Sequence, residues 1–107
     1  MAMPWFVYVA RCKDGSFYTG IAIDVAKRIA QHDAGKGARY TRGRGPLMLL
    51  AKRRCETQGA ALRLELAVKR LSHDEKELLS RGRHRFRALY LSASSPAGSA
   101  QQRKPVE

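Results

Sequence analysis

Two phenols, one guanidinium and one carboxylate are the side chains of this sequence whose types and positions could do chemistry. They belong to Tyr8, Tyr18, Arg28 and Glu65. A carboxylate can hold a hard divalent cation, a guanidinium can bind an oxyanion, and a phenol can exchange a proton. Each residue also has an ordinary structural interpretation, so the helices and strands that must position it are considered first.

Glu65 lies on a predicted helix over about residues 58–71, which Thr57 can cap. At about 100° per residue, apolar side chains flank Glu65 on both sides. They are Ala61, Leu64 and Val68 on one side and Leu62 and Leu66 on the other. A carboxylate inside an apolar arc is costly unless a cation meets it, and a metal ion is one such cation. The ordinary alternative, which periodicity alone favours, is an i, i+4 ion pair with Lys69.

A second helix over about residues 25–34 carries Arg28 and His32 on one face, since they are four residues apart. Asp24 is the predicted cap of this helix, and Gly35 is its predicted end. Arg28 borders the apolar stripe of the helix, where it could reach across to the sheet and clamp a phosphate. The alternative is that its aliphatic stem covers the edge of the core, with His32 an ordinary helix residue.

The two tyrosines lie on a predicted antiparallel hairpin over residues 5–22, which is rich in aromatic and β-branched residues. A two-residue turn would place Tyr8 and Tyr18 on opposite faces, as ordinary strand aromatics. A three-residue loop would place them on one face, with Tyr8 opposite Gly20. The longer loop suits Gly15, because its last residue needs the left-handed conformation. Gly20 would then leave space above Tyr8 for a ligand.

The predicted elements follow the order β-β-α-β-α-α. After the first helix, Pro46 opens an apolar run over residues 47–51 that is typical of a buried strand. Ser72 and Glu75 have the spacing of a capping box, which predicts a third helix to about Ser80. The order indicates an α/β mixed (α+β) fold, with a small three-stranded antiparallel sheet flanked by helices.

A chain of 107 residues, 44% of them hydrophobic, is long enough for one compact domain. We expect that domain to span residues 1–91. Residues 83–91 could form a strand or a ragged helix. Residues 92–107 are small and polar with two prolines, which predicts a disordered tail.

The cysteines and the N-terminus indicate the compartment. Cys12 and Cys55 lie far apart and have no near partner at metal-ligand spacing, so we expect buried free thiols. The N-terminus lacks the features of a signal peptide, and no segment is long enough for a membrane span. A cytoplasmic protein is therefore expected.

The charge is strongly positive, with 21 lysines and arginines against 9 aspartates and glutamates and a net charge of +12. Such a field attracts DNA or RNA, although a solvated basic surface without a ligand is the alternative. Four of these cations lie in a glycine- and arginine-rich loop over residues 35–45, and a second cluster of four arginines follows at 81–87. An aromatic ring within such a loop can stack on a base. The predicted nucleic-acid-binding residues are Lys36, Arg39, Tyr40, Arg42 and Arg44.

Taken together, these residues resemble the GIY-YIG nuclease superfamily, in particular its small stand-alone YhbQ-like members. The first motif is represented here by Phe6-Val7-Tyr8 and the second by Tyr18-Thr19-Gly20. Arg28 falls ten residues after the second tyrosine, and His32 follows one helical turn later. Each motif alone is weak, and it is their order and spacing that carry the resemblance.

Two further segments extend the resemblance over roughly residues 4–80. Residues 61–71 look like the metal-binding helix of the family, with Glu65 as its acid, and residues 35–42 are similar to the loop of its small members. The first motif departs from the family in lacking its glycine and isoleucine. The chain also contains no asparagine, which some members place near the site.

The resemblance implies hydrolysis of phosphodiester bonds with one Mg²⁺ or Mn²⁺ held by Glu65. In that scheme a tyrosine is the general base toward the attacking water; Tyr8 is our choice, and Tyr18 would orient the water. Arg28 would offset charge on the phosphate, and His32 would contact the phosphate or assist proton transfer. Because free tyrosine has a pKa of about 10, only nearby cations could make Tyr8 a useful base near neutrality.

In families of this kind an attached domain generally supplies specificity; we expect none here, so the basic loop would have to bind the substrate itself. A flexible loop with one aromatic suits single-stranded or branched DNA better than plain duplex, and the sequence leaves DNA and RNA both open. Two alternative functions are a non-catalytic nucleic-acid-binding module and a DNA-repair adaptor that recruits its partner through residues 81–107.

Overall fold

A computed structural model describes residues 3–79 and 81 of the chain. Its elements are β1 (Trp5–Arg11), β2 (Phe17–Ala22), α1 (Val25–Asp33), the short 3₁₀ turn η1 (Arg39–Thr41), β3 (Met48–Cys55), α2 (Gln58–Lys69) and α3 (His73–Leu79). The three strands form one sheet in the order β2-β1-β3, and both pairs are antiparallel. The predicted α+β class and element order are confirmed. The segment 83–91, the predicted domain end at residue 91 and the predicted tail lie outside the described residues.

The β1–β2 hairpin has the three-residue loop that the site requires. The backbone amide of Cys12 donates to the carbonyl of Ser16 at 2.8 Å, and Gly15 has a φ of 87° at the end of the loop. Only glycine adopts that left-handed conformation without strain. In this register Tyr8 is the partner of Gly20, and Ala10 is the partner of Tyr18, so both tyrosines lie on one face of the sheet.

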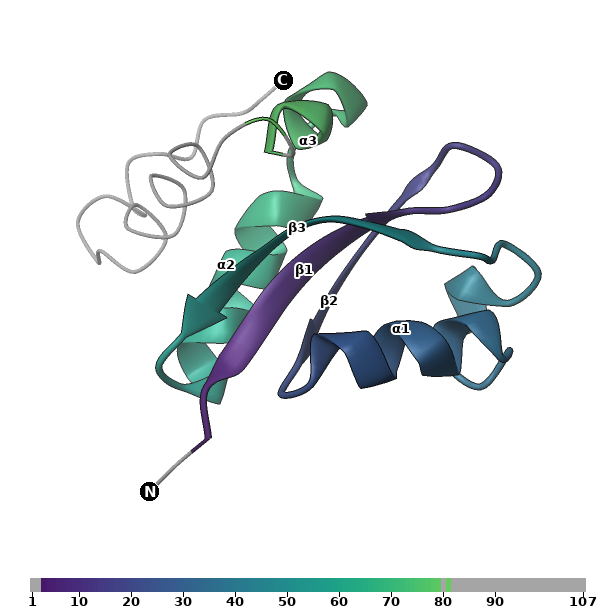
Figure 1. Cartoon of the computed structure of the whole chain (residues 1–107). Coiled ribbons are helices and arrows are strands. Elements are labelled where there is room, and N and C mark those ends of the chain that lie inside the picture. The colour runs from purple at the N-terminus through teal and green to yellow at the C-terminus, as the bar shows by residue number, and fades with distance from the viewer. Residues whose placement is uncertain (1–2, 80, 82–107) are drawn as a thin grey trace.

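The two larger helices cover opposite faces of the sheet, as Figure 1 shows. On one face Val7 and Val9 pack in one cluster with Leu64 and Val68 of α2. On the other face Tyr8 packs against α1 through Val25. Because strand residues alternate between faces, the apolar core lies mostly on the α2 side and the polar aromatic residues lie under α1.

The predicted helix starts are confirmed by their hydrogen bonds. Asp24 and Thr57 each accept a backbone amide hydrogen bond at 3.0 Å from three residues further along their helices. At α3, Ser72 and Glu75 form the reciprocal bonds of a capping box, at 2.8 and 3.1 Å. Gly35 follows α1 with a φ of 79°, as expected for a glycine that ends a helix. The sequence and the structure place the helix ends within about two residues of each other.

The predicted third strand is confirmed, but the prediction that the run 47–51 is buried was wrong for all of it except Leu47. β3 lies at the edge of the sheet, and Met48 and Leu49 expose 62% and 41% of their surface. A register shift against β1 between Val9 and Ala10 interrupts the pairing next to them. The strand also continues to Cys55, past a run of cations that is favourable at an edge because it discourages further strand pairing.

Both cysteines are buried and free, as predicted. Cys12 packs beside Leu47 at one end of the sheet, and Cys55 belongs to the main core under α2. Among the described residues, no helix is both long and apolar enough to cross a membrane.

Candidate active site

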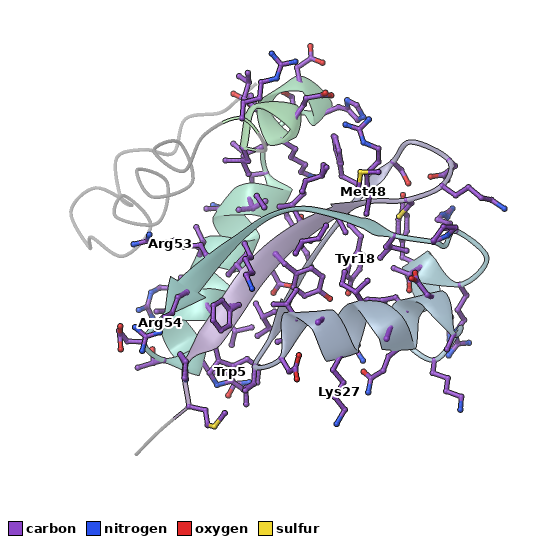
Figure 2. All side chains as sticks on the ribbon, in the orientation of Figure 1. Trp5, Tyr18, Lys27, Met48, Arg53 and Arg54 are labelled. Carbon is purple, nitrogen blue, oxygen red and sulfur yellow. The ribbon has the colours of Figure 1, made fainter. Side chains whose placement is uncertain are left out.

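Tyr8 and Tyr18 meet above Gly20, and their ring centroids are 6.2 Å apart. A β-carbon at Gly20 would lie 2.7 Å from the Tyr8 hydroxyl and 3.0 Å from the Tyr18 ring. The expected open space above Tyr8 is therefore absent, because the phenol of Tyr8 itself fills it. Figure 2 shows Tyr18 between the sheet and α1. Tyr8 has no exposed surface, whereas Tyr18 is half-buried.

His32 completes a hydrogen-bonded pair with Tyr8. The Nε2 atom of His32 is 2.8 Å from the Tyr8 hydroxyl, and the ring is 1% exposed. The His32 ring also meets Tyr18 edge-on, with centroids 4.9 Å apart. Burial lowers the pKa of His32, and the charge of Arg28 lowers it further, so this imidazole is neutral at neutral pH. His32 is therefore a core histidine with both nitrogens engaged rather than an ordinary helix residue.

Arg28 lies at the edge of the same cluster, half-buried, with a hydrogen bond from its guanidinium to Gln31 at 3.0 Å. Burial raises the pKa of both tyrosines, and the neighbouring Tyr18 raises that of Tyr8 further. The positive charge of Arg28 acts against this rise in both residues. Lys27 points away from the sheet on the other side of α1 (Figure 2). The helix thus directs one cation toward the phenols and one toward solvent.

Glu65 has the alternative partner that periodicity favoured: its carboxylate is 3.4 Å from the ammonium of Lys69. Its side chain is only 16% exposed, and its charge raises the pKa of both Tyr8 and Tyr18. The charge of the Glu65 carboxylate thus acts on both phenols even though α2 covers the opposite face of the sheet.

The apolar arc around Glu65 is only half covered. Leu64 is fully buried, but Leu62 and Leu66 are 44% and 55% exposed. Glu65 consequently lies at the boundary of the core and not within an apolar arc, which corrects the expectation from the helical wheel. At this boundary a carboxylate keeps part of its hydration and remains able to bind a cation.

The basic loop closes over the tyrosines from the side. Tyr40 stacks on Tyr18 with centroids 6.2 Å apart and planes at 19°, and the guanidinium of Arg44 lies 4.2 Å from the Tyr40 ring. Arg44 also pairs with Asp14 at 3.4 Å, which ties the loop to the hairpin turn. Of the five predicted binding residues, Tyr40 therefore contacts the site cluster, and Arg44 contacts Tyr40. The other three, Lys36, Arg39 and Arg42, are exposed along the same loop.

Sequence reasoning missed two residues that complete the cluster. Thr41 is fully buried, with its hydroxyl 2.8 Å from Nδ1 of His32. Gly37 lies so close to His32 that a β-carbon there would overlap the ring. A loop has no periodicity that could mark an inward-facing threonine, although a Gly-x-Gly run shortly after a helical histidine is compatible with close backbone approach.

Comparison with known proteins places the chain in a family. The sequence pattern of the GIY-YIG catalytic domain matches residues 4–78. The UPF0213 protein of Desulfotalea psychrophila is 42% identical over 96 residues, which are 88% of this chain and 87% of that protein. The UPF0213 protein YhbQ of Salmonella typhimurium is 42% identical over 93 residues, which are 87% of this chain and 93% of that protein. The chain therefore belongs to the GIY-YIG family and, within it, to the UPF0213 proteins.

A solved structure supports the fold. The solution NMR structure of a protein from E. faecalis, 33% identical, matches with a TM-score of 0.54 over 78% of this chain and 88% of that chain. The resemblance of the sequence motifs to this family is thus confirmed for the fold and the family.

Proposed function

We propose that this protein is a metal-dependent endonuclease that hydrolyses phosphodiester bonds in DNA, single-stranded or branched in preference to plain duplex. The observation that carries the proposal is the convergence of Tyr8, Tyr18, Arg28 and His32 on one side of the sheet, with Glu65 near enough to affect both phenols. Membership of a family of catalytic domains makes nucleic acid the expected partner. The net charge of +12 favours the same partner.

Glu65 would hold the divalent cation. Within the described residues no three metal-ligating side chains gather, so the protein offers a single carboxylate and not a closed cage. That donor set fits Mg²⁺ or Mn²⁺, which take one or two carboxylates and fill their other positions with water and phosphate oxygens. A cation there would stabilise negative charge on the scissile phosphate and on the leaving oxygen.

The tyrosines and His32 would handle the proton of the attacking water. Tyr8 is fully buried and its pKa is raised, so by itself it is a poor base. Its hydroxyl lies 2.8 Å from a neutral imidazole, which can take the phenol proton as the phenol takes a proton from water. Tyr18, the more exposed phenol, would hold that water in contact with Tyr8. Arg28 would offset charge on the phosphate oxygens.

The loop would bind the nucleic-acid strand on either side of the scissile phosphate. Lys36, Arg39 and Arg42 are exposed cations that can neutralise backbone phosphates. Tyr40 is 43% exposed, and a base could stack on its ring beside Arg44. Contacts of these kinds suit a strand whose bases are unpaired.

The burial of Tyr8 and the pairing of Glu65 with Lys69 favour a second candidate, a nucleic-acid-binding module without catalysis. In such a module the aromatic cluster would be a packed core, and the loop alone would be functional. The alternative of a DNA-repair adaptor depends on partner binding through residues 81–107, nearly all of which lie outside the described residues.

Cleavage of labelled single-stranded, branched and duplex DNA, in Mg²⁺, Mn²⁺ or chelator, tests the proposal. We expect Glu65→Gln to lower the cleavage rate by about 1000-fold or more, because charge stabilisation by the cation is worth several kcal/mol. DNA affinity, measured by fluorescence anisotropy, should change little. Glu56→Gln is the matched control, since Glu56 is an exposed carboxylate paired with Arg54. Cleavage that survives in chelator, or in Glu65→Gln, contradicts the metal mechanism, and binding without cleavage of any substrate favours the second candidate.

A further inference from the structure

Thr41 is the fully buried polar residue of the basic loop, and its hydroxyl joins two groups. It lies 2.8 Å from the carbonyl oxygen of Ala38 and 2.8 Å from Nδ1 of His32. The other ring nitrogen of His32 is 2.8 Å from the Tyr8 hydroxyl. A continuous chain of hydrogen bonds therefore runs from the loop through His32 to Tyr8.

The proton positions along this hydrogen-bond chain follow from the carbonyl oxygen of Ala38 at its end. A carbonyl oxygen accepts and never donates, so the Thr41 hydroxyl donates to Ala38 and must accept from Nδ1–H of His32. Nε2 then carries a lone pair and accepts the hydroxyl proton of Tyr8. In this arrangement each of the three contacts at 2.8 Å has one proton.

The competing arrangement places the His32 proton on Nε2. The hydroxyl of Thr41 and the amide of Ala38, 3.3 Å away, would then both donate to Nδ1. That would leave the oxygens of Thr41 and Ala38 facing each other at 2.8 Å with no proton between them. The first arrangement gives up the hydrogen bond from the Ala38 amide to Nδ1, which at 3.3 Å is the longest of these contacts, and keeps one proton in each contact at 2.8 Å. It is therefore the more favourable of the two.

We propose that Thr41 is a positioning residue that holds His32 as its Nδ1–H tautomer, so that Nε2 is free to receive the proton of Tyr8. This role rests on the proposed function for its catalytic consequence. When water attacks, its O–H bond breaks and the proton goes to the Tyr8 oxygen, while the phenol proton passes to Nε2. His32 becomes an imidazolium, and the hydroxide is the nucleophile.

The location of Thr41 couples this proton acceptor to substrate binding. Thr41 lies on η1, next to Tyr40 and directly before Arg42, two of the proposed DNA-binding residues. Gly37, earlier in the same loop, packs against the His32 ring. A nucleic-acid strand bound by the loop thus contacts the same turn, η1, that sets the His32 tautomer.

The tautomer can be read in the free full-length chain by ¹⁵N NMR, since protonated and unprotonated ring nitrogens have widely separated chemical shifts. We expect the Nδ1–H tautomer for His32 in the wild type. Thr41→Val should shift the ring toward Nε2–H, and Thr41→Ser should restore the wild-type spectrum. Thr19→Val is the matched control, because Thr19 is also buried and its hydroxyl has no hydrogen-bond partner among the described residues.

Cleavage and binding of a single-stranded oligonucleotide in Mn²⁺ complete the test. Thr41→Val should lower the single-turnover cleavage rate by about 100-fold, the usual scale of a general-base contribution, while Kd changes less than about twofold. Thr41→Ser and Thr19→Val should keep the wild-type rate.

An Nε2–H ring in the wild type would overturn the proposal, as would equal spectra for Thr41→Val and Thr19→Val. If Thr41→Val fails to fold, a displaced tautomer or a lost rate in Thr41→Ser would overturn it instead. The NMR measurement needs no substrate. Lack of cleavage by the wild type would therefore count against the proposed function and leave the tautomer assignment standing.

Discussion

Gly20 is the residue whose size determines how closely the two phenols approach the sheet. We predict that Gly20→Ala lowers the free energy of unfolding by about 1–3 kcal/mol, because the added β-carbon would lie 2.7 Å from the Tyr8 hydroxyl and 2.9 Å from its ring. The displaced phenol should also lose its hydrogen bond to His32, and cleavage with it. Urea denaturation and the cleavage assay measure the two effects.

Gly59→Ala is the matched control for this substitution. A β-carbon at Gly59, in the first turn of α2, would meet Arg63 and Thr57 only at 3.6 and 3.9 Å, which are ordinary contacts. Its free energy of unfolding should be unchanged or raised by up to about 1 kcal/mol, since alanine favours a helix over glycine. Equal stability of Gly20→Ala and the wild type would show that the phenol is not held where the structure places it.

At the scale of elements, α1 carries both Arg28 and His32, and its start is fixed by Asp24. The Asp24 carboxylate accepts the amide of Lys27 at 3.0 Å. We predict that Asp24→Ala lowers the free energy of unfolding by about 1 kcal/mol, because an N-cap bond is lost. Urea denaturation measures the change.

Asp24→Asn keeps an acceptor oxygen at the cap and is the control. It should retain most of the stability and lose only the favourable interaction of a negative charge with the helix dipole, a few tenths of a kcal/mol. If Asp24→Asn were as destabilised as Asp24→Ala, charge and not capping would fix the start of α1.

The elements that were predicted well have local signals. Asp-Gly at the hairpin, Asp24 and Thr57 before their helices, and the Ser72–Glu75 box each depend on the conformation of three or four consecutive residues. For the same reason the register that brings the two tyrosines to one face followed from the left-handed conformation that a glycine permits at the end of the loop.

The features that could not be predicted from the sequence depend on which other elements a helix, strand or loop packs against. An apolar run such as 47–51 has the same composition at the edge and at the centre of a sheet, so the exposure of β3 became visible only with the strand order. Helical periodicity gives the direction of each side chain of α2 but not the extent of the sheet beneath it. The exposure of Leu62 and Leu66 was therefore not predicted. The contact of Thr41 with His32 joins a loop to a helix, and only the folded chain brings them together.

At the scale of the whole molecule, a net charge of +12 should make DNA binding strongly dependent on salt. We predict that Arg39→Ala and Arg42→Ala each weaken binding and lower the slope of log Kd against log salt concentration by about 0.7 to 1 unit. The physical reason is that each arginine displaces about one condensed counterion from the strand. Anisotropy titrations between low and moderate salt measure the slope.

Arg63→Ala is the control for these loop variants, since Arg63 is an exposed cation on α2, outside the basic loop. It should leave the slope nearly unchanged. An unchanged slope in the loop variants, with a reduced slope in Arg63→Ala, would place the binding surface on the helix instead of the loop.

The contacts of His32 with Ala38 and Thr41 leave the backbone between residues 37 and 41 little freedom in length. Exposed side chains in this stretch and directly beside it can be exchanged without disturbing the buried ring. In a laboratory selection for new substrates, we therefore expect accepted variants to carry replacements at Lys36, Arg39 or Arg42, and insertions between Gly37 and Thr41 to be rejected. The protein would then acquire new substrate preferences by substitution and not by insertion of residues.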